Sequence, residues 1–288
     1  MASLLAETRR LLLTHGLRPK RRLGQRFLID RTVLGKILDG GELRREDRVL
    51  EIGAGVGTLT HSLAERCSRV VAVEIDPGLF RILQHVLGGN AQVTLVHGDA
   101  LHLDYTSLLG EEGPWKVIAN LPYSIATPLI ARLLNLSDCF SFLLLMVQQE
   151  VAERLMASPG NKAYGSLTVL AQYYTDVRMM LRVSRTAFYP RPQVDSALVK
   201  LDIPPKPRVS PRDPSLFFRL VRAAFAHRRK TLKNALAQLD WIPFERDELR
   251  AIIERAGIDP HRRGETLNLQ EFRMLADHLL DEIKGVAA

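Results

Sequence analysis

Residues 48–58 have the sequence RVLEIGAGVGT, a short apolar run that ends in a glutamate and three alternating glycines. The run predicts a buried strand, and the glycines predict a tight turn where a ligand can approach the main chain before a helix begins. More short apolar runs follow, separated by helical patterns: strands at 70–75, 93–96, 116–119 and 142–147, helices at 58–65, 78–87 and 128–134. This alternation predicts an α/β fold, Rossmann-like, with a mostly parallel sheet and helices on both faces.

The second half of the chain departs from this alternation. Residues 177–183 and 196–201 predict an antiparallel hairpin at the sheet edge, which brings the sheet to seven strands. After a proline-rich connector that begins at Pro204, the pattern is entirely helical. The further helices are expected at 149–156, 166–174, 214–239, 245–256 and 269–284. We therefore predict three parts: a basic N-terminal segment at 1–26, a catalytic domain at 27–203 and a small all-α domain at 204–288.

Composition excludes several classes of protein. The chain has 288 residues, a net charge of +8 and only two cysteines, so no disulfide framework is expected. Its longest run free of polar residues is far shorter than the ~20 residues that span a bilayer. No Cys/His cluster has zinc spacing, and we expect no metal site. A protein of a reducing compartment, the cytoplasm, is the class that remains.

The positive charge is concentrated in the two flanks. Residues 1–26 hold 7 basic and 1 acidic side chains, and residues 204–288 hold 16 and 12, whereas residues 27–203 hold 17 and 19. Basic flanks around a slightly acidic core are typical of a chain that binds a polyanion through the flanks. Charge alone leaves a second interpretation open, which is a solvated basic surface.

Acidic residues follow the next two strands. Glu74 lies 21 residues after Gly53, and Asp99 follows the third strand. A carboxylate at the first place can accept hydrogen bonds from ribose hydroxyls, and one at the second can accept from an adenine amine. The third glycine, Gly57, comes one residue earlier than in the dinucleotide fingerprint, so the loop suits a ligand without phosphates. The set favours S-adenosylmethionine over a nicotinamide cofactor.

The motif Asn120-Leu121-Pro122-Tyr123 follows the fourth strand. An amine on an aromatic base is a poor nucleophile because its lone pair is delocalised, and two acceptors on its N–H groups localise that pair. The Asn120 side-chain oxygen and the Leu121 carbonyl can supply these acceptors. Pro122 fixes the backbone, and Tyr123 offers a ring on which a base can stack. The motif therefore predicts a class I methyltransferase that acts by direct displacement on an exocyclic amine.

Together these motifs resemble the ribosomal RNA adenine N6-dimethyltransferase family. The segments GQRFL at 24–28, GDA at 98–100 and FYPRP at 188–192 carry the resemblance with the glycine loop and the asparagine motif. Further segments are similar to the small-subunit branch typified by KsgA rather than to the Erm resistance methyltransferases: NKAYG at 161–165, VDS at 194–196 and FAHRRKTL at 225–232. The resemblance covers nearly the whole chain.

The resemblance implies roles for the matching residues. Cofactor contacts are expected from Gln25, Arg26, Leu28, Gly53, Gly55, Glu74, Ile75, Asp99, Ala100 and Asn120. Catalytic contacts to the target adenine are expected from Asn120, Leu121, Pro122, Tyr123 and Phe188. Contacts to ribosomal RNA are expected from Arg18, Lys20, Arg21, Arg22, Arg222, Arg228, Arg229, Lys230 and Lys233. Arg26 departs from the family's usual Asn or His. A main-chain contact there would make this change harmless, whereas a side-chain contact would change cofactor affinity, because a guanidinium near a sulfonium is unfavourable.

The activity that the resemblance implies is dimethylation, with S-adenosylmethionine, of two adjacent adenosines near the 3′ end of small-subunit (16S) ribosomal RNA. The partner would be the 30S pre-ribosomal particle, and the enzyme would act as a monomer. An Erm-like 23S enzyme is one alternative, and a ribosome-assembly checkpoint that mainly binds is another. DNA adenine N6-methyltransferases usually carry Pro-Pro where Leu121-Pro122 stands here. A mitochondrial transcription-factor relative is not favoured, because no transit peptide is evident.

Overall fold

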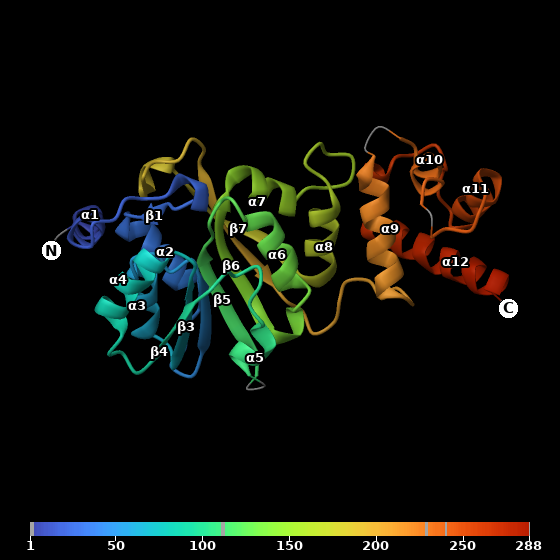
Figure 1. The fold of residues 1–288 in the computed structure, drawn as a ribbon. Helices are drawn as coiled ribbons and strands as arrows, with labels where there is room; N and C mark the ends of the chain where they lie inside the picture. The colour runs from blue at the N-terminus through green and yellow to red at the C-terminus, as the bar shows by residue number, and fades with distance from the viewer. Residues whose placement is uncertain (1–2, 111–112, 228–229, 240, 288) are drawn as a thin grey trace. The chain divides into compact units, whose positions relative to one another are not determined.

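The computed structural model describes residues 3–110, 113–227, 230–239 and 241–287, and Figure 1 shows the course of the chain. Contacts divide the chain into two units. The first unit consists of Met1–Ala152 with Asp176–Pro204, and the second of Glu153–Thr175 with Pro205–Ala288. These units differ from the predicted parts in two respects, because the N-terminal residues pack into the first unit and residues 153–175 pack with the C-terminal helices.

The first unit is built on a seven-stranded sheet with the order β4-β3-β2-β5-β6-β9-β7. Its strands are β2 Arg48–Ile52, β3 Arg69–Glu74, β4 Val93–His97, β5 Trp115–Asn120, β6 Phe140–Gln148, β7 Asp176–Val183 and β9 Ser196–Asp202. The strands from β2 to β6 pair in parallel, and β9 pairs antiparallel with both β6 and β7. The predicted mostly parallel sheet of seven strands is therefore confirmed, with its antiparallel pair at one edge.

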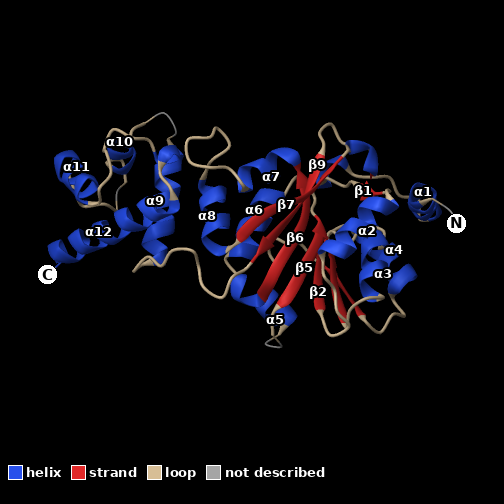
Figure 2. Cartoon of the chain, turned by 180° about the vertical axis from the view of Figure 1, so that it is seen from behind, coloured by secondary structure: helices blue, strands red, loops and turns tan. Residues whose placement is uncertain are grey.

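Helices cover both faces of this sheet. They are α1 Leu4–Thr14, α2 Arg31–Gly40, α3 Thr58–Ala64, α4 Pro77–Leu87, α5 Tyr105–Leu109, α6 Ala126–Leu134 and, at the boundary of the units, α7 Gln149–Leu155. Apolar side chains of α2, α3 and α4, such as Ile37 and Leu63, pack against Val49 and Leu144 of the sheet. Figures 1 and 2 place α6 on the opposite face.

A two-stranded ribbon ties the N-terminal segment to a distant loop. Strand β1, Phe27–Leu28, pairs antiparallel with β8, Phe188–Tyr189. The Ile29 N–H donates to the Ala187 carbonyl at 2.8 Å and extends the pairing. The sequence did not predict this ribbon, because two-residue strands have no measurable periodicity. The ribbon places residues 20–28 above the carboxyl ends of the central strands.

The second unit is helical. Its helices are α8 Ser166–Tyr174, α9 Pro214–Ala226, α10 Leu232–Leu236, α11 Arg246–Arg255 and α12 Leu269–Ala287. Helix α8 belongs here because Tyr173 packs on Phe217, with ring centroids 5.4 Å apart, and because the Tyr164 hydroxyl donates to the Leu267 carbonyl at 2.8 Å. The prediction of one helix over 214–239 is wrong: α9 ends at Ala226, and the next residue, His227, has φ −130° and ψ 73°.

Candidate active site

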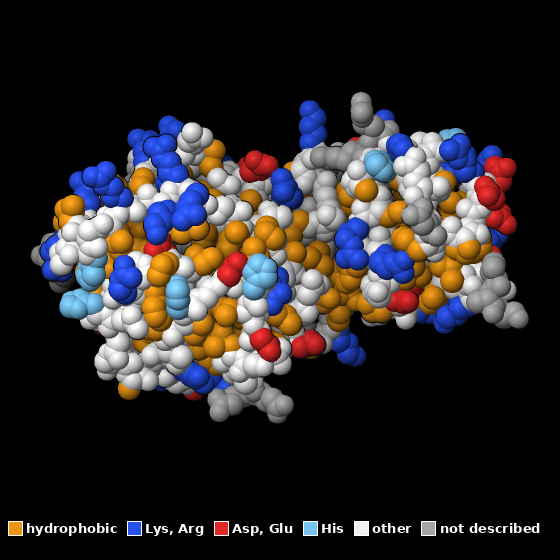
Figure 3. Space-filling view, in the orientation of Figure 1, with side chains coloured by type: hydrophobic (Ala, Val, Ile, Leu, Met, Phe, Trp, Pro, Cys, Tyr) orange, Lys and Arg blue, Asp and Glu red, His pale blue; other side chains and the backbone are white. Residues whose placement is uncertain are grey.

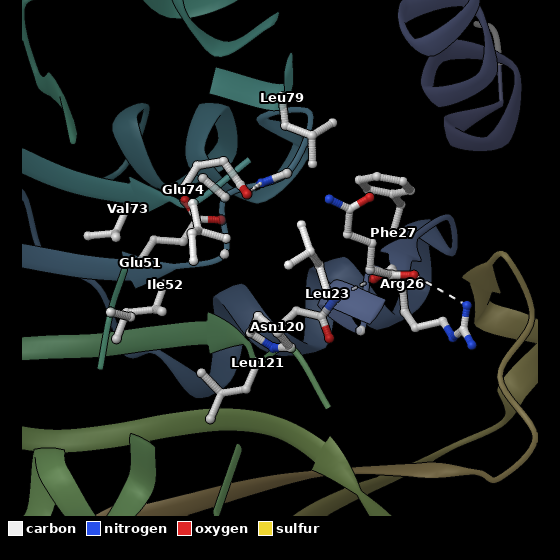
Figure 4. Close-up of a pocket in the computed structure, with 18 of the residues that line it drawn as sticks. Leu23, Arg26, Phe27, Glu51, Ile52, Val73, Glu74, Leu79, Asn120 and Leu121 are labelled. Carbon is white, nitrogen blue, oxygen red and sulfur yellow. Dashed lines mark hydrogen bonds between the residues drawn. The ribbon is translucent and has the colours of Figure 1, made fainter. Parts of the chain in front are cut away.

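A pocket lies outside the carboxyl ends of β2, β3 and β5, entirely within the first unit (Figure 4). The strand order reverses at this site, because β3 lies on one side of β2 and β5 lies on the other. Ligands bind at such a switch point in open parallel sheets. Residues of five segments line the pocket: 23–28; 51–56 with 58 and 59; 73–75 with 79; 98–100; and 120–122 with 125.

The glycine loop has the shape that its sequence requires. Gly53 and Gly55 have φ values of 78° and 63°, which only glycine adopts readily. A Cβ on Gly53 would lie 3.2 Å from the Pro122 ring, and one on Gly55 would lie 3.2 Å from the Phe27 ring. Backbone conformation and close packing therefore both exclude a side chain, and the loop brings its main chain against the target motif and the N-terminal segment.

Glu74 holds the loops that surround it. It is 5% exposed, and its two carboxylate oxygens accept hydrogen bonds from the Gly55 and Asp76 N–H groups, each at 2.9 Å. Burial raises the pKa of Glu74 above its usual value. A carboxylate oxygen can accept more than one hydrogen bond, so Glu74 keeps capacity for a ligand diol while it fixes the loops on either side.

Asp99 has a different environment from Glu74. The Leu101 N–H donates to Asp99 at 2.9 Å, and the His102 ring nitrogen lies 2.9 Å from the other carboxylate oxygen. The hydrogen bond from Leu101 is the main cause that lowers the pKa of Asp99. Ile75, which is 41% exposed, and Ala100, which is 4% exposed, give this end of the pocket apolar walls. The sequence analysis did not identify the contact between His102 and Asp99.

Asn120 presents an open acceptor at the end of β5. Its side-chain N–H donates to the Arg26 carbonyl at 2.8 Å, whereas its buried Oδ1 has no hydrogen-bond partner among the described residues. The Leu121 N–H is held by the Met146 carbonyl at 3.1 Å. The Tyr123 hydroxyl hydrogen-bonds with Ser196, and burial raises the pKa of Tyr123. Asn120 is therefore oriented with its nitrogen toward the protein and its oxygen available to a donor.

The N-terminal segment contributes its main chain to the pocket more than its charge. The Arg26 guanidinium donates to the Gln25 carbonyl at 3.3 Å and extends away from Asn120 (Figure 4). The Arg26 contact that faces the site is its carbonyl, which Asn120 holds. Leu28 is 7% exposed and lines the pocket from β1. The arginine in place of the family's smaller residue is accommodated because its side chain leaves the pocket.

Phe188 departs from the expectation of an open stacking face. It is 2% exposed and packs in the apolar core beside Leu28 and Ala187. Its strand β8 pairs with β1, so the ring lies under the N-terminal segment. A base can contact this ring only after the covering side chains move.

With the site described, its relatives can be compared. A family model described as ribosomal RNA adenine dimethylase matches residues 16–279. The chain belongs to this family. The ribosomal RNA small subunit methyltransferase A of Clostridium botulinum (strain ATCC 19397 / Type A) is 48% identical over 259 residues, which cover 90% of this chain and 93% of the relative.

Solved structures agree with this membership. A dimethyladenosine transferase from Plasmodium falciparum has a TM-score of 0.72 and 26% identity, and the match covers 90% of this chain and 98% of that one. The 23S rRNA methyltransferase ErmE has a TM-score of 0.65 and 25% identity, covering 88% of this chain and 99% of that one. The expected family, fold class, enzyme class and methyl donor are confirmed.

The pocket fits S-adenosylmethionine, the donor of this dimethylase family. Two carboxylates, Glu74 and Asp99, lie along one side for hydroxyl and amine donors. The buried Oδ1 of Asn120 and Oε2 of Glu51 have no partner among the described residues, so both have hydrogen-bonding capacity left for a ligand. Arg26 is the sole Lys or Arg among the described lining residues, and its guanidinium points away, so the pocket has no charged group placed to hold a phosphate.

Glu51 is the lining residue that the sequence analysis missed as a site residue. It is 2% exposed, and its Oε2 has no hydrogen-bond partner among the described residues. Burial raises the pKa of Glu51 from 4.5 to about 8, and the nearby Glu74 adds to the increase. Its position as the last acidic residue before the glycines is the signal that could have identified it.

The expected RNA contacts occupy different environments. Arg18, Arg21 and Arg22 are exposed, whereas Lys20 is ion-paired with Asp76. Figure 3 shows Lys and Arg side chains gathered on one part of the first unit. In the second unit, Arg222 is exposed on α9, and Lys230 and Lys233 are half-buried near α10. Arg228 and Arg229 lie outside the described residues. Of the two described lysines, Lys233 lies in α10 and Lys230 precedes that helix.

Two further features concern metal binding and membrane-spanning helices. Within the described ranges, the structure contains no group of three or more His, Cys, Asp or Glu side chains that could hold a metal ion. The helices of those same ranges are all too short or too polar to cross a membrane.

Proposed function

We propose that this member of the family transfers methyl groups from S-adenosylmethionine to the N6 atoms of two adjacent adenosines near the 3′ end of small-subunit ribosomal RNA. The substrate would be a 30S precursor in the cytoplasm, and the enzyme would act as a monomer. The relative with 48% identity is named for the small ribosomal subunit, which favours that subunit over the large one. The observation that carries the proposal is the unpartnered Oδ1 of Asn120 next to the glycine loop.

The target motif can activate an aromatic amine without a strong base. S-adenosylmethionine supplies an electrophilic methyl group on a sulfonium. Asn120 Oδ1 and the Leu121 carbonyl accept the two N–H groups of the adenine amine, which localises the nitrogen lone pair. The hydrogen bond from the Asn120 nitrogen to Arg26 keeps its oxygen toward the amine. After transfer the cationic amine loses its excess proton to water.

Tyr123 holds the base. Its hydroxyl is fixed by Ser196 on β9, so the ring is held at both ends. A target nucleotide that leaves the RNA stack can place its base on this ring. Phe188 would contact the opposite side of the base once the covering side chains have moved. The expected cofactor residues lie around the rest of the pocket: Gln25, Arg26, Leu28, Gly53, Gly55, Glu74, Ile75, Asp99 and Ala100.

The direct test is incubation with methyl-labelled cofactor and 30S particles that lack the modification, followed by mapping of the labelled bases. Label on two adjacent adenosines near the 3′ end of 16S RNA is expected. Parallel reactions contain 23S RNA and adenine-containing duplex DNA. Label confined to 23S RNA would assign the chain to the Erm-like activity, and label on DNA would contradict both RNA assignments.

A second experiment separates catalysis from assembly surveillance. Glu74→Ala removes the carboxylate that holds Gly55 and Asp76, and we expect loss of cofactor binding and of methylation. The variant is expressed in cells that lack the wild-type enzyme, and assembly of the small subunit is followed by sedimentation. Restored assembly without methylation would identify binding as the main role.

A further inference from the structure

Asp76 is a buried carboxylate with three different partners. It is 2% exposed and lies two residues after Glu74, which is the last residue of β3. Its Oδ1 caps α4 by accepting the Gly78 N–H at 2.8 Å. Its Oδ2 lies 2.8 Å from the Lys20 ammonium and accepts the Gln25 side-chain N–H at 3.0 Å. Both Lys20 and Gln25 come from the N-terminal segment, more than 50 residues away in sequence.

These contacts form a closed loop. The Lys20 backbone N–H donates to the Gln25 Oε1 at 2.7 Å, so the Gln25 amide bridges Lys20 and Asp76. Burial alone would raise the pKa of Asp76, but the hydrogen bonds from Lys20 and Gln25 keep it below its usual value. The carboxylate is therefore ionised, and both of its oxygens are hydrogen-bonded. A buried charge needs such partners to be stable.

The segment fixed in this way is one wall of the pocket. Residues 23–28 line it, and we call residues 20–28 the cover segment. Its far end is anchored by Asn120, which donates to the Arg26 carbonyl, and by the pairing of β1 with β8. Its near end is held to the ligand-binding strands through Asp76.

The cover segment also touches the target motif. Gly24 has φ 65°, and a Cβ there would lie 3.0 Å from the backbone nitrogens of Tyr123 and Ser124. The Asp76 N–H donates to Glu74 at 2.9 Å. One side of the cover segment is thus linked to the proposed ribose carboxylate and the other is packed against the loop proposed to hold the base.

We propose that Lys20 and Gln25 are positioning residues, which close the cover segment over the bound cofactor by binding Asp76. This inference rests on the proposed function and adds to it the device that retains the cofactor. It also reassigns Lys20, which the sequence suggested as an RNA contact: its ammonium is committed to a buried carboxylate, whereas its neighbours Arg21 and Arg22 are exposed.

The test compares Lys20→Met with two matched variants in the full-length protein. Calorimetry measures the dissociation constants of S-adenosylmethionine and S-adenosylhomocysteine, and filter binding measures RNA affinity against salt. Lys20→Met should weaken cofactor binding about tenfold and leave the RNA salt slope unchanged. Arg22→Met should do the reverse. Lys36→Met, on an exposed lysine of α2, should change neither quantity.

Asp76→Asn provides the reciprocal test. Asparagine also caps helices, so the start of α4 is preserved while the charge that holds Lys20 is lost. The double variant should bind cofactor no more weakly than Asp76→Asn alone, because both changes remove the same interaction. Hydrogen exchange in residues 20–28 should increase in Lys20→Met without cofactor, and thermal unfolding shows whether each variant is folded.

The outcomes are distinct. Unchanged cofactor affinity in folded Lys20→Met overturns the positioning role, as does an altered RNA salt slope with unchanged cofactor affinity. Additive effects of the Lys20 and Asp76 changes would also overturn it. If the wild-type protein binds neither S-adenosylmethionine nor S-adenosylhomocysteine, it is the proposed function that fails, and the variants are not the cause.

Discussion

The first unit buries charged side chains at both ends of its sheet, and the two ends differ in how these charges are paired. At the amino end of the parallel strands, Lys116 binds Asp47 at 2.6 Å, and Lys200, only 2% exposed, binds Glu42 at 2.7 Å. At the carboxyl end, Glu51 and Asn120 each keep a buried oxygen without a partner among the described residues. Buried polar groups are almost always satisfied, and both of these residues line the pocket, so the carboxyl end is the one built for a ligand.

The amino end shows what a purely structural charge cluster looks like in this protein. The Lys116 ammonium also donates to the Glu42 carbonyl at 2.8 Å, and the Lys200 ammonium lies 4.3 Å from the centre of the Phe142 ring. Each cation thus has several partners within the protein. A buried charge alone does not mark a functional site in this protein. A buried oxygen that lines the pocket and has no hydrogen-bond partner does.

The largest effect is expected from Asn120→Ala, which removes the open acceptor. Methylation of 30S particles should fall by about 10²-fold or more, because the amine loses one of the two groups that localise its lone pair. Cofactor affinity, measured by calorimetry, should change far less. Asn120→Asp is the control, since it keeps an acceptor but loses the N–H that binds the Arg26 carbonyl. Wild-type turnover in the alanine variant would refute the mechanism.

At the amino end, Lys200→Ala should destabilise the fold by about 3 kcal/mol, because it leaves a cavity beside Phe142 and removes the ion pair with Glu42. Lys200→Met keeps the volume and removes the buried charge, so it should cost less than about 1 kcal/mol. Urea unfolding measures both. Neither variant should change cofactor affinity, and a change would show that the two ends of the sheet are coupled.

Glu51→Gln tests the carboxyl end through pH. Because burial raises the pKa of Glu51 from 4.5 to about 8, the folded state binds a proton more tightly than the unfolded state does. The wild-type protein should therefore lose stability as pH rises from about 5 to 8, by on the order of 4 kcal/mol from this group. Glutamine is neutral throughout, so the variant should gain stability relative to wild type at pH 9 and not at pH 5. Equal pH profiles by thermal unfolding would show that Glu51 is ionised in the folded protein.

The same contrast explains what the sequence could predict. The central strands β2, β3, β5 and β6 were predicted to within a few residues because their apolar runs depend on burial on both faces. The expectation of a buried strand at 93–96 is wrong, because β4 lies at the sheet edge and has no buried residue. The site acids Glu74 and Asp99 were predicted because parallel strands bring their carboxyl ends together. The ribbon between β1 and β8 and the ion pair of Lys20 with Asp76 were not predicted, since they depend on contacts between distant segments.

Local signals also failed where a short interruption changed the geometry. The apolar spacing over 214–239 is helical throughout, yet helix α9 ends at Ala226 and α10 begins at Leu232. The Leu232 N–H donates to the Arg262 carbonyl at 2.7 Å, a tertiary contact that fixes the new direction. Phe188 shows the same limit, because the family resemblance suggested a contact with the target adenine while its burial depends on the segment that covers it.

The smallest effect is expected from single neutralisations on the second unit. Arg222 is exposed on α9, so Arg222→Gln should weaken RNA binding only a few-fold and reduce the slope of log affinity against log salt by about one. Arg250→Gln is the matched control, because Arg250 already binds Glu254 on its own helix at 2.8 Å. Filter binding of 30S particles over a range of salt measures both slopes. Equal slopes in wild type and Arg222→Gln would mean that this face of α9 is solvated rather than bound to phosphate, and the net positive charge of the second unit would then have no RNA contact at this position.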